Sequence, residues 1–453
     1  MRLSELALIT GGRLRGADAD FDGVNIDSRS VQPGQLFVAI PGPRFDGHDF
    51  VAQVAAQGVP GAMVTRLVDC DLTQVEVADS RHALGRLAAA WRDRSAVRVV
   101  GITGSNGKTT AKEMVAAVLA QAGDVLKTRG NLNNDLGVPL TLLELGPAHR
   151  YAVIEMGANH PGEIAYVAAL ARPAVGLITN AGSAHLEGFG SRAGVARAKG
   201  ELLTALAPEG VAVLNADDAF FGLWRQLAGD RPVVSFGFGI GAQVRGLPGS
   251  VGTVWAEQGF HTTFEFEFGD RRYAARIGLA GRHNVANALA AIAVGVSLEV
   301  PLESVLVGLA QVSPVAGRMQ PDRATAGALI INDSYNANPS SFGAALDVLL
   351  QLPGEPWVAL GAFGELGQAS AELHAELGRQ ARAMGVRRLF ATGPDAERSV
   401  ETFGSGGRYF AEQAELIGQL QQELREDVVV LVKGSRSQRM DRVVEALCGG
   451  ARG

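Results

Sequence analysis

Short apolar runs that end in glycine-rich or polar turns recur through the middle and last parts of the chain, and stretches with helical apolar spacing separate them. The expected strands lie at 97–103, 151–157, 175–180, 211–216, 328–333, 357–363, 388–393 and 428–435. Strands that alternate with helices are typical of mostly parallel sheets covered by helices on both faces. In such sheets, ligands bind at the carboxyl ends of the strands, so the residues there are the first candidates for function.

The first 95 residues show a different pattern of predicted strands and helices. Two short strand-like pieces flank a turn at Pro33 and Gly34, and a helix is expected from a cap at Asp49 to a stop at Gly58. A chain of 453 residues is too long for one core and suits three domains. The predicted fold class is α/β with a small N-terminal α/β domain, a central P-loop parallel sheet and a C-terminal Rossmann-like domain. These domains are expected at 1–95, 96–315 and 316–453.

The sequence VVGITGSNGKTT at 99–110 joins a buried strand to a helix. Its glycines allow a close approach of the backbone to an anion, and the N–H groups of the helix start point at that anion. Lys108 is expected to neutralise the outer phosphates, and the Thr109 hydroxyl is expected to face magnesium. The general P-loop pattern has a glycine six residues before the lysine, where this chain has Ile102. The alternative is a glycine-rich turn that binds nothing.

The composition of the chain argues against several classes of protein. The net charge of −6 argues against a general nucleic-acid binder, which would present a basic face. Two cysteines, Cys70 and Cys448, make no disulfide framework and fit a reducing cytoplasm. No secretory signal and no apolar run long enough to span a membrane is evident.

Two polar residues follow strands on the same expected sheet edge as the glycine turn. Glu155 closes an apolar strand, where a carboxylate can bind magnesium beside a nucleotide or cap the next segment. His185 lies in a loop rich in glycine and serine, and is either a metal ligand or a surface residue. Magnesium prefers oxygen ligands, so an imidazole ligand is unusual for it.

Lys199 and a pair of asparagines lie on predicted helices. Lys199 is either solvated or reacts with carbon dioxide to form a carbamate that can bind magnesium, which requires a lowered pKa beside positive charge. Asn284 and Asn287 are three residues apart at a helix start, and suit either an adenine edge or capping.

The start of the last domain and the N-terminal domain carry further polar candidates. Asp333 ends a strand and can accept hydrogen bonds from ribose hydroxyls, whereas Asn336 and Asn338 precede Pro339 and also suit a turn and a helix cap. Arg29, beside Ser28, is either a phosphate ligand or a solvated surface residue.

Several motifs appear in an order that resembles the Mur ligase family, which builds the peptide of bacterial cell-wall precursors. They are TGSNGKTT, VIEMGAN, the His185 loop, GRHNVANALAA, Gly317-Arg318 and VKGS. The resemblance covers nearly the whole chain. The stretches DSRSVQPGQLFVAI, GNLNNDLGVPLTLL, EMGANHPGEI, DSYNANPSS and FGELG are similar to the branch that uses D-alanyl-D-alanine. Ala362-Phe363 departs from the family, which often has a charged residue there.

The resemblance implies an ADP-forming ligase of peptidoglycan synthesis that joins D-alanyl-D-alanine to UDP-N-acetylmuramoyl-tripeptide, with ATP and two Mg²⁺ ions. A cytoplasmic location is expected, and nothing in the sequence demands more than a monomer. Phosphates would be held by the turn residues Thr103, Gly104, Ser105, Asn106, Gly107, Lys108, Thr109 and Thr110. Catalytic and metal roles would fall to Lys108, Thr109, Glu155, His185 and carbamylated Lys199. Nucleotide contacts would come from Asn284, Asn287, Arg318 and Asp333, and substrate contacts from Ser28, Arg29, Asn336 and Asn338.

Three other readings remain at this point. A folylpolyglutamate synthase or another Mur-type amino acid ligase would share the chemistry, although the DSRSVQPG stretch argues against the former. A regulatory nucleotide-binding switch would not respond to a dipeptide. A P-loop kinase for a small molecule is disfavoured by the second nucleotide-type domain and by DSYNANP.

Overall fold

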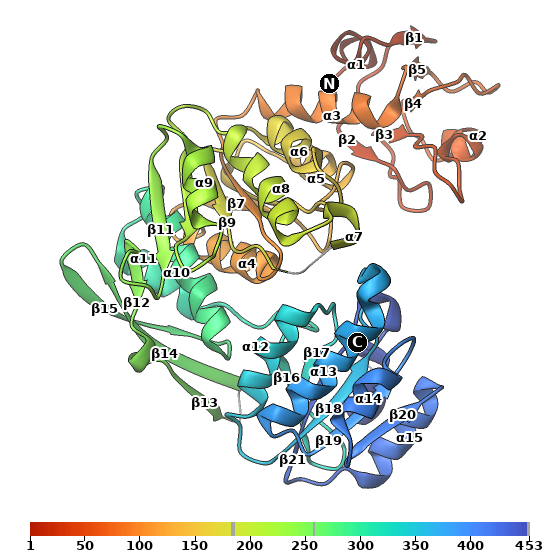
Figure 1. The fold of residues 1–453 in the computed structure, drawn as a ribbon. Helices are drawn as coiled ribbons and strands as arrows, with labels where there is room; N and C mark the ends of the chain where they lie inside the picture. The colour runs from red at the N-terminus through yellow and green to blue at the C-terminus, as the bar shows by residue number, and fades with distance from the viewer. Residues whose placement is uncertain (183–185, 257–258, 451–453) are drawn as a thin grey trace.

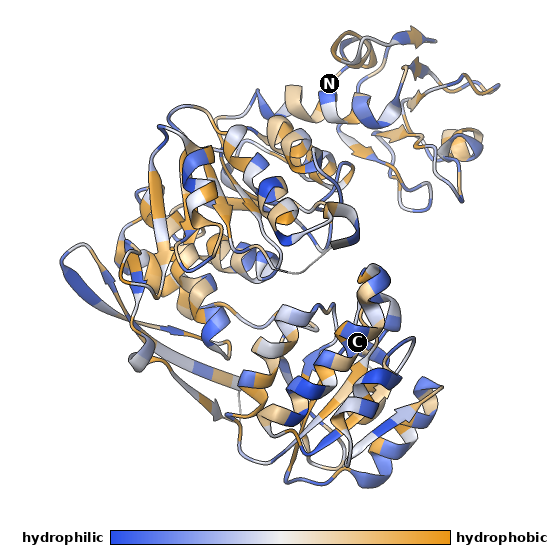
Figure 2. Cartoon of the chain, viewed as in Figure 1, coloured by the Kyte–Doolittle hydropathy of each residue, from blue (hydrophilic) through white to orange (hydrophobic). Residues whose placement is uncertain are grey.

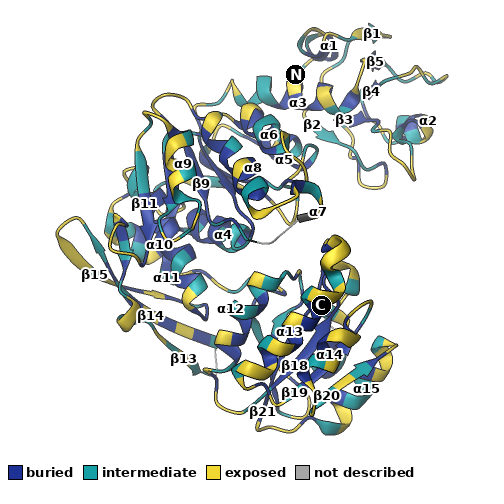
Figure 3. Cartoon of the chain, in the orientation of Figure 1, coloured by how far each residue is buried: buried dark blue, intermediate teal, exposed yellow. Residues whose placement is uncertain are grey.

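The computed structural model describes residues 1–182, 186–256 and 259–450, and within these ranges the chain forms three sheets, one after another along the sequence (Figure 1). The predicted α/β class with three domains is confirmed. Apolar strands fill the interior of each domain, and the hydrophilic faces of the helices point outward (Figure 2). The central strands are buried, whereas the outer helical faces are exposed (Figure 3).

The N-terminal sheet has the strand order β1-β5-β4-β3-β2 and is parallel except at the β1–β5 edge. Its elements are α1 (Leu3–Thr10), β1 (Arg13–Arg15), β2 (Gly23–Asn25), β3 (Gln35–Val38), η1 (Gly47–Phe50), α2 (Val51–Ala55), β4 (Ala62–Val64), β5 (Gln74–Glu76) and α3 (Ser80–Arg92). The predicted cap at Asp49 is wrong. The chain first makes the 3₁₀ turn η1, whose cap is Asp46, because the Asp46 carboxylate accepts from the His48 N–H at 3.0 Å.

The central domain is built on parallel strands in the order β11-β10-β9-β6-β8-β7. The burial of strand β6 explains why the sequence of this strand is largely apolar. Val100 and Ile102 enter the core on one face, and Val99 enters the core on the other, so both faces of the sheet are buried. The strands are β6 (Arg98–Thr103), β7 (Asp124–Lys127), β8 (His149–Glu155), β9 (Val175–Ile178), β10 (Val211–Asn215) and β11 (Val233–Gly237). The helices are α4 (Lys108–Leu119), α5 (Gly137–Leu143), α6 (Glu163–Ala171), α7 (Leu186–Phe189), α8 (Arg192–Thr204), α9 (Phe221–Ala228), α10 (Arg282–Ser297) and α11 (Leu302–Ala310).

An antiparallel extension continues the central sheet, and the sequence analysis did not predict it. It comprises β12 (Val244–Gly246), β13 (Gly252–Ala256), β14 (Gly259–Phe268) and β15 (Arg271–Ile277), with the short turn η2 (Pro248–Ser250). Strand β14 pairs with the other three strands. Near the start of β14, Phe260 is buried in the core of the C-terminal domain, and Trp255 of β13 packs against that core. The extension therefore joins two domains through shared apolar packing.

The C-terminal sheet has the order β16-β17-β21-β18-β19-β20, with β16 antiparallel at the edge and the other pairings parallel. Its strands are β16 (Gln320–Arg323), β17 (Leu329–Asp333), β18 (Glu355–Gly361), β19 (Arg388–Thr392), β20 (Gly407–Phe410) and β21 (Val428–Lys433). Its helices are α12 (Pro339–Leu349), η3 (Gly367–Ala369), α13 (Ser370–Met384), α14 (Glu397–Phe403), α15 (Gln413–Glu423), η4 (Arg436–Gln438) and α16 (Asp441–Leu447). Across the described ranges, no helix combines the length and the apolar character needed to cross a bilayer.

Candidate active site

The glycine turn joins the end of β6 to the start of α4, as the sequence predicts. Gly107 is the N-terminal flanking residue of α4 and has φ of +80°, in the region that favours glycine. A Cβ atom at this position would lie 2.5 Å from Oδ1 of Asn287. The glycine is therefore required both by its backbone conformation and by the close approach of α10. The residues at the start of α4 line the adjoining cavity, and the free N–H groups of a helix start can bind phosphate.

The Lys108 side chain folds back over the turn. Its Nζ donates to the carbonyl oxygen of Gly104 at 2.7 Å and lies 3.4 Å from that of Ser105. Burial lowers the pKa of the Lys108 ammonium, and Arg318 adds to this shift, whereas the carboxylate of Glu155 opposes it. The two carbonyl contacts hold the cation at the mouth of the turn, where it can exchange them for phosphate oxygens.

A hydroxyl and a carboxylate meet beside Lys108. The Thr109 Oγ1 donates to Oε2 of Glu155 at 3.0 Å. The other carboxylate oxygen of Glu155 accepts from Nδ2 of Asn133 at 2.9 Å, and the Glu155 N–H donates to Oγ1 of Thr128 at 2.9 Å. Glu155 is buried, so three hydrogen bonds fix both its backbone and its side chain. Oxygen donors of these two types suit Mg²⁺.

The described residues include no cluster of three or more His, Cys, Asp or Glu side chains able to hold a metal. Lys199, on α8, is 1% exposed, and its ammonium lies 5.5 Å from the ring centre of Phe189. Burial lowers the pKa of Lys199 to about 7, the positive charge of Lys108 adds to the shift, and Glu201 and Glu163 oppose it. A buried amine with this pKa is half neutral at pH 7, which is the form that reacts with carbon dioxide.

The two asparagines of α10 lie behind the glycine turn. Asn284 and Asn287 are both buried, and Nδ2 of Asn287 donates to Oδ1 of Asn284 at 3.2 Å. Asn284 also donates to the carbonyl oxygen of Ala280 at 2.8 Å. Part of the hydrogen-bonding capacity of the pair is thus used within the helix, and both side chains still line the cavity.

The C-terminal domain supplies charged and aromatic groups to the same cavity. The Asp333 carboxylate and the Lys433 ammonium, both at strand ends, form a buried ion pair at 2.5 Å. The guanidinium of Arg318 lies 4.3 Å from the ring centre of Tyr335, and its Nε is buried with no hydrogen-bond partner among the described residues. A buried donor without a partner is unusual in a folded protein, and Arg318 itself lines the cavity.

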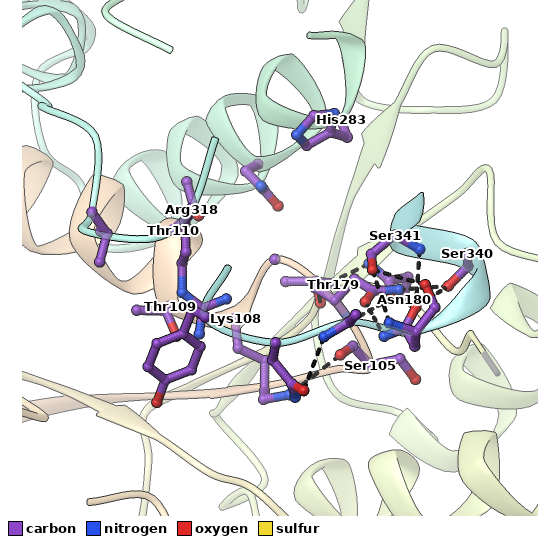
Figure 4. A pocket seen from close by; sticks show the side chains of 18 of the residues that line it. Ser105, Lys108, Thr109, Thr110, Thr179, Asn180, His283, Arg318, Ser340 and Ser341 are labelled. Carbon is purple, nitrogen blue, oxygen red and sulfur yellow. Dashed lines mark hydrogen bonds between the residues drawn. The ribbon is translucent and has the colours of Figure 1, made fainter. Parts of the chain in front are cut away.

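The two domains share one cavity of about 740 Å³. Of the predicted site residues it is lined by Ser105, Asn106, Gly107, Lys108, Thr109, Thr110, Glu155, Asn284, Asn287, Arg318, Asp333, Asn336 and Asn338. Figure 4 shows the labelled residues of the glycine turn and those of α12 facing each other. Asn106 connects them: its Nδ2 donates to Ser340 Oγ at 2.8 Å, and its Oδ1 accepts from Asn338 Nδ2 at 2.6 Å.

Other predicted residues lie elsewhere. Thr103 and Gly104 are buried and do not line the cavity, and the Thr103 hydroxyl donates to the carbonyl oxygen of Met156 at 2.8 Å. Ser28 is buried in the N-terminal domain, and Arg29 is 85% exposed and forks onto Asp27 at 2.7 and 2.9 Å. That pairing lowers the pKa of Asp27 to about 2. Neither Ser28 nor Arg29 lines the shared cavity. His185 lies outside the described residues.

The sequence analysis missed several residues that line or support this cavity. Asn133 lies in GNLNN, which the sequence analysis uses only as a mark of resemblance, and its side chain donates to the Glu155 carboxylate. Tyr335, His283 and Ser340 also line the cavity. Burial lowers the pKa of His283. The motifs DSYNANPSS and GRHNVANALAA contained these residues, but no pattern within them distinguishes a lining side chain from a packed one.

Comparisons with known proteins identify the same family in each part of the chain. Family models match at residues 20–92 (Mur ligase family, catalytic domain), 102–295 (Mur ligase middle domain) and 317–436 (Mur ligase, glutamate ligase domain). An Escherichia coli K12 protein named UDP-N-acetylmuramoyl-tripeptide--D-alanyl-D-alanine ligase is 43% identical over 452 residues, covering 98% of each chain. A Haemophilus influenzae protein of the same name is 37% identical over 98% of this chain and 97% of its own.

Solved structures give the same result. A crystal structure of MurF from Acinetobacter baumannii is 38% identical, covers 98% of both chains and superposes with a TM-score of 0.91. The MurF ligase from Thermotoga maritima in complex with ADP is 30% identical, with a TM-score of 0.83 over 94% of this chain and 96% of its own. On its full-length relatives and the three family models, this chain belongs to the Mur ligase family.

Proposed function

We propose that this chain is an ATP-dependent ligase of peptidoglycan precursor synthesis. It joins D-alanyl-D-alanine to UDP-N-acetylmuramoyl-tripeptide in the cytoplasm and releases ADP and phosphate. The observation that carries the proposal is the cavity where the glycine turn with Lys108 faces the N-terminus of α12. Full-length relatives with the corresponding name, and the ADP complex of one solved relative, support the choice of nucleotide and substrates.

The chemistry must bring two anions together, the carboxylate of the peptide and the terminal phosphate of ATP. Lys108 and the N–H groups at the start of α4 offset their repulsion with fixed positive charge and dipoles. The carboxylate oxygen attacks phosphorus to give an acyl phosphate, and ADP leaves. The amine of the dipeptide then attacks the acyl carbon, loses a proton and expels phosphate. Closure of the two domains excludes water, which would otherwise hydrolyse the acyl phosphate.

The proposal includes two magnesium ions held by residues of this chain. Thr109 and Glu155 offer a hydroxyl and a carboxylate 3.0 Å apart for the first. Glu155, His185 and Lys199 as a carbamate would hold the second, and the lowered pKa of Lys199 supports the carbamate. When bound, magnesium neutralises phosphate charge and orients the oxygens that react.

The remaining assignments follow the division into domains. Residues 1–95 would bind the UDP part of the substrate, with Ser28 and Arg29 as contacts. Residues 96–315 would bind ATP, with Asn284 and Asn287 on the adenine. Residues 316–453 would bind the incoming amine. Arg318 and Asp333 would contact ribose or phosphate, and Asn336 and Asn338 the substrate. The protein would act as a monomer.

The test is a product assay with purified protein, ATP, magnesium, a set of UDP-linked tripeptides and a panel of dipeptides. The expected result is a product heavier than the tripeptide by one D-alanyl-D-alanine residue pair, formed with one ADP per product. A folylpolyglutamate synthase from Mycobacterium tuberculosis shares the fold at 17% identity and a TM-score of 0.64, so folates with glutamate form the matched control. Ligation of glutamate to folate would refute the proposal. An equal rate of ADP release with and without the dipeptide would also refute it.

A further inference from the structure

A buried lysine in α4 has no part in the chemistry described so far. Lys112 is 2% exposed, and its Nζ donates to the backbone carbonyl oxygen of Thr128 at 2.7 Å. The same ammonium is 3.1 Å from Oε1 of Glu113, whose other oxygen pairs with Lys127 at 2.5 Å. Lys112 is therefore a cation inside the protein that is held by one carbonyl and one carboxylate.

The contact with Thr128 leads directly to the proposed magnesium site. Thr128 follows β7 and is fully buried, and its Oγ1 accepts from the Glu155 N–H at 2.9 Å. The Glu155 carboxylate in turn accepts from Thr109 Oγ1 at 3.0 Å. Thr109 and Lys112 are three residues apart in α4, so they lie on one face of that helix. Three hydrogen bonds and one helical turn thus form a closed ring, from Lys112 through Thr128 and Glu155 to Thr109.

The ring ties together the two elements that carry the metal-binding groups. Thr109 lies on α4. Glu155 lies at the end of β8, and a hydrogen bond to Thr128 holds this end. Mg²⁺ demands near-ideal octahedral geometry at about 2.0–2.1 Å, so small displacements between these two side chains cost affinity. Moving an ammonium from water into the protein interior is unfavourable, and an apolar side chain of similar volume is often as good or better for stability. A charged residue here is therefore better explained by what it orients than by what it stabilises.

We propose that Lys112 is a positioning residue that keeps Thr109 and Glu155 in register for magnesium by anchoring Thr128. This inference rests on the proposed magnesium site. It assigns no contact between Lys112 and substrate, nucleotide or metal. Its effect passes entirely through the carbonyl of Thr128 and the backbone of Glu155.

The experiment measures metal binding without turnover. Mn²⁺ replaces Mg²⁺ and is titrated by electron paramagnetic resonance into the full-length protein with saturating ADP. Lys112→Met removes the ammonium and keeps a long side chain. Lys127→Met is the matched control, because Lys127 pairs with the same Glu113 but is 47% exposed and lies outside the ring. Loss of a group that orients a metal ligand typically weakens metal affinity about 10–100-fold. We expect about tenfold weaker Mn²⁺ binding for Lys112→Met and less than twofold change for Lys127→Met.

A second variant keeps the test decisive if Lys112→Met does not fold. Thr128→Val removes the hydroxyl that accepts from Glu155 and leaves the backbone carbonyl in place, and it should weaken Mn²⁺ binding to a similar extent. In the double variant, the loss of Mn²⁺ affinity should be smaller than the product of the two single losses, because both substitutions break the same ring. The inference would be overturned if folded Lys112→Met or Thr128→Val bound Mn²⁺ with wild-type affinity. It would also be overturned if the loss in the double variant equalled the product of the two single losses. Absence of Mn²⁺ binding by the wild-type protein would instead refute the magnesium site itself.

Discussion

The carbamate at Lys199 gives the most quantitative prediction. With a pKa of about 7, about half of the Lys199 amines are neutral at pH 7, compared with about one in 3,000 for a lysine at the ordinary value of 10.5. The folded protein thus raises the concentration of the reactive amine by roughly three orders of magnitude. Protein stripped of carbon dioxide should lose activity, and added bicarbonate should restore it.

The pH dependence of this recovery distinguishes a buried amine from an ordinary one. Because the pKa is depressed, the neutral fraction rises through pH 7 and then levels off. At a fixed concentration of dissolved carbon dioxide, the initial rate of recovery should rise about tenfold from pH 6 to pH 8. An amine with a pKa of 10.5 would show a rise of about 100-fold over the same range.

Two measurements check the assignment. Labelled bicarbonate and ¹³C NMR should detect a carbamate carbon that is lost in Lys199→Arg, which retains a cation but offers no lysine amine. Recovery of activity should follow the growth of that signal. Full activity without carbon dioxide, together with no carbamate signal in the wild-type protein, would refute the reasoning from burial.

Four further predictions concern the glycine turn and the domain contact. Lys108→Ala should lower kcat by at least ~100-fold in ADP release, since it removes a preorganised donor to the reacting phosphate, and activity near wild type would contradict the phosphate assignment. Gly107→Ala should lower the free energy of unfolding in urea by about 1–2 kcal/mol, because of its positive φ and the contact with Asn287; an unchanged value would count against that strain. Nucleotide plus substrate should change the small-angle scattering profile as the C-terminal domain closes, and identical profiles would contradict closure. Ser340→Ala should increase the radius of gyration of the ligand-free protein by removing a hydrogen bond to Asn106 of about 1 kcal/mol, whereas an unchanged radius would indicate that other contacts hold the domains.

The sequence was sufficient for features that local pattern determines. The apolar run before the glycine turn, the lysine and the helix that follows predict the position of Lys108 and Thr109, because strand, turn and helix start are adjacent in the chain. The carboxyl ends of parallel strands share one sheet edge, so the approach of Glu155 to that turn was also predictable. The antiparallel extension was missed, although the alternation in HTTFEFEF at 261–268 is a period-two signal for a strand.

Burial and long-range contacts were beyond the sequence. Lys112 and Lys199 lie in helices whose patterns are equally consistent with solvated lysines, and only tertiary packing encloses them. Arg29 illustrates the opposite case. Its position in a polar turn suited either a phosphate ligand or a solvated residue, and the structure shows it exposed and paired with Asp27, two residues away. The contact between Asn106 and Ser340 joins residues 234 positions apart, which no local pattern encodes.

The antiparallel extension constrains how the last domain can move. Phe260 is 1% exposed within the C-terminal core, although its strand belongs to the central sheet. Withdrawing that ring into water would cost about 1.5–3 kcal/mol, whereas turning around it costs little apolar surface. The ring therefore links the C-terminal domain to the central sheet, and its burial opposes movement of the last domain away from the cavity.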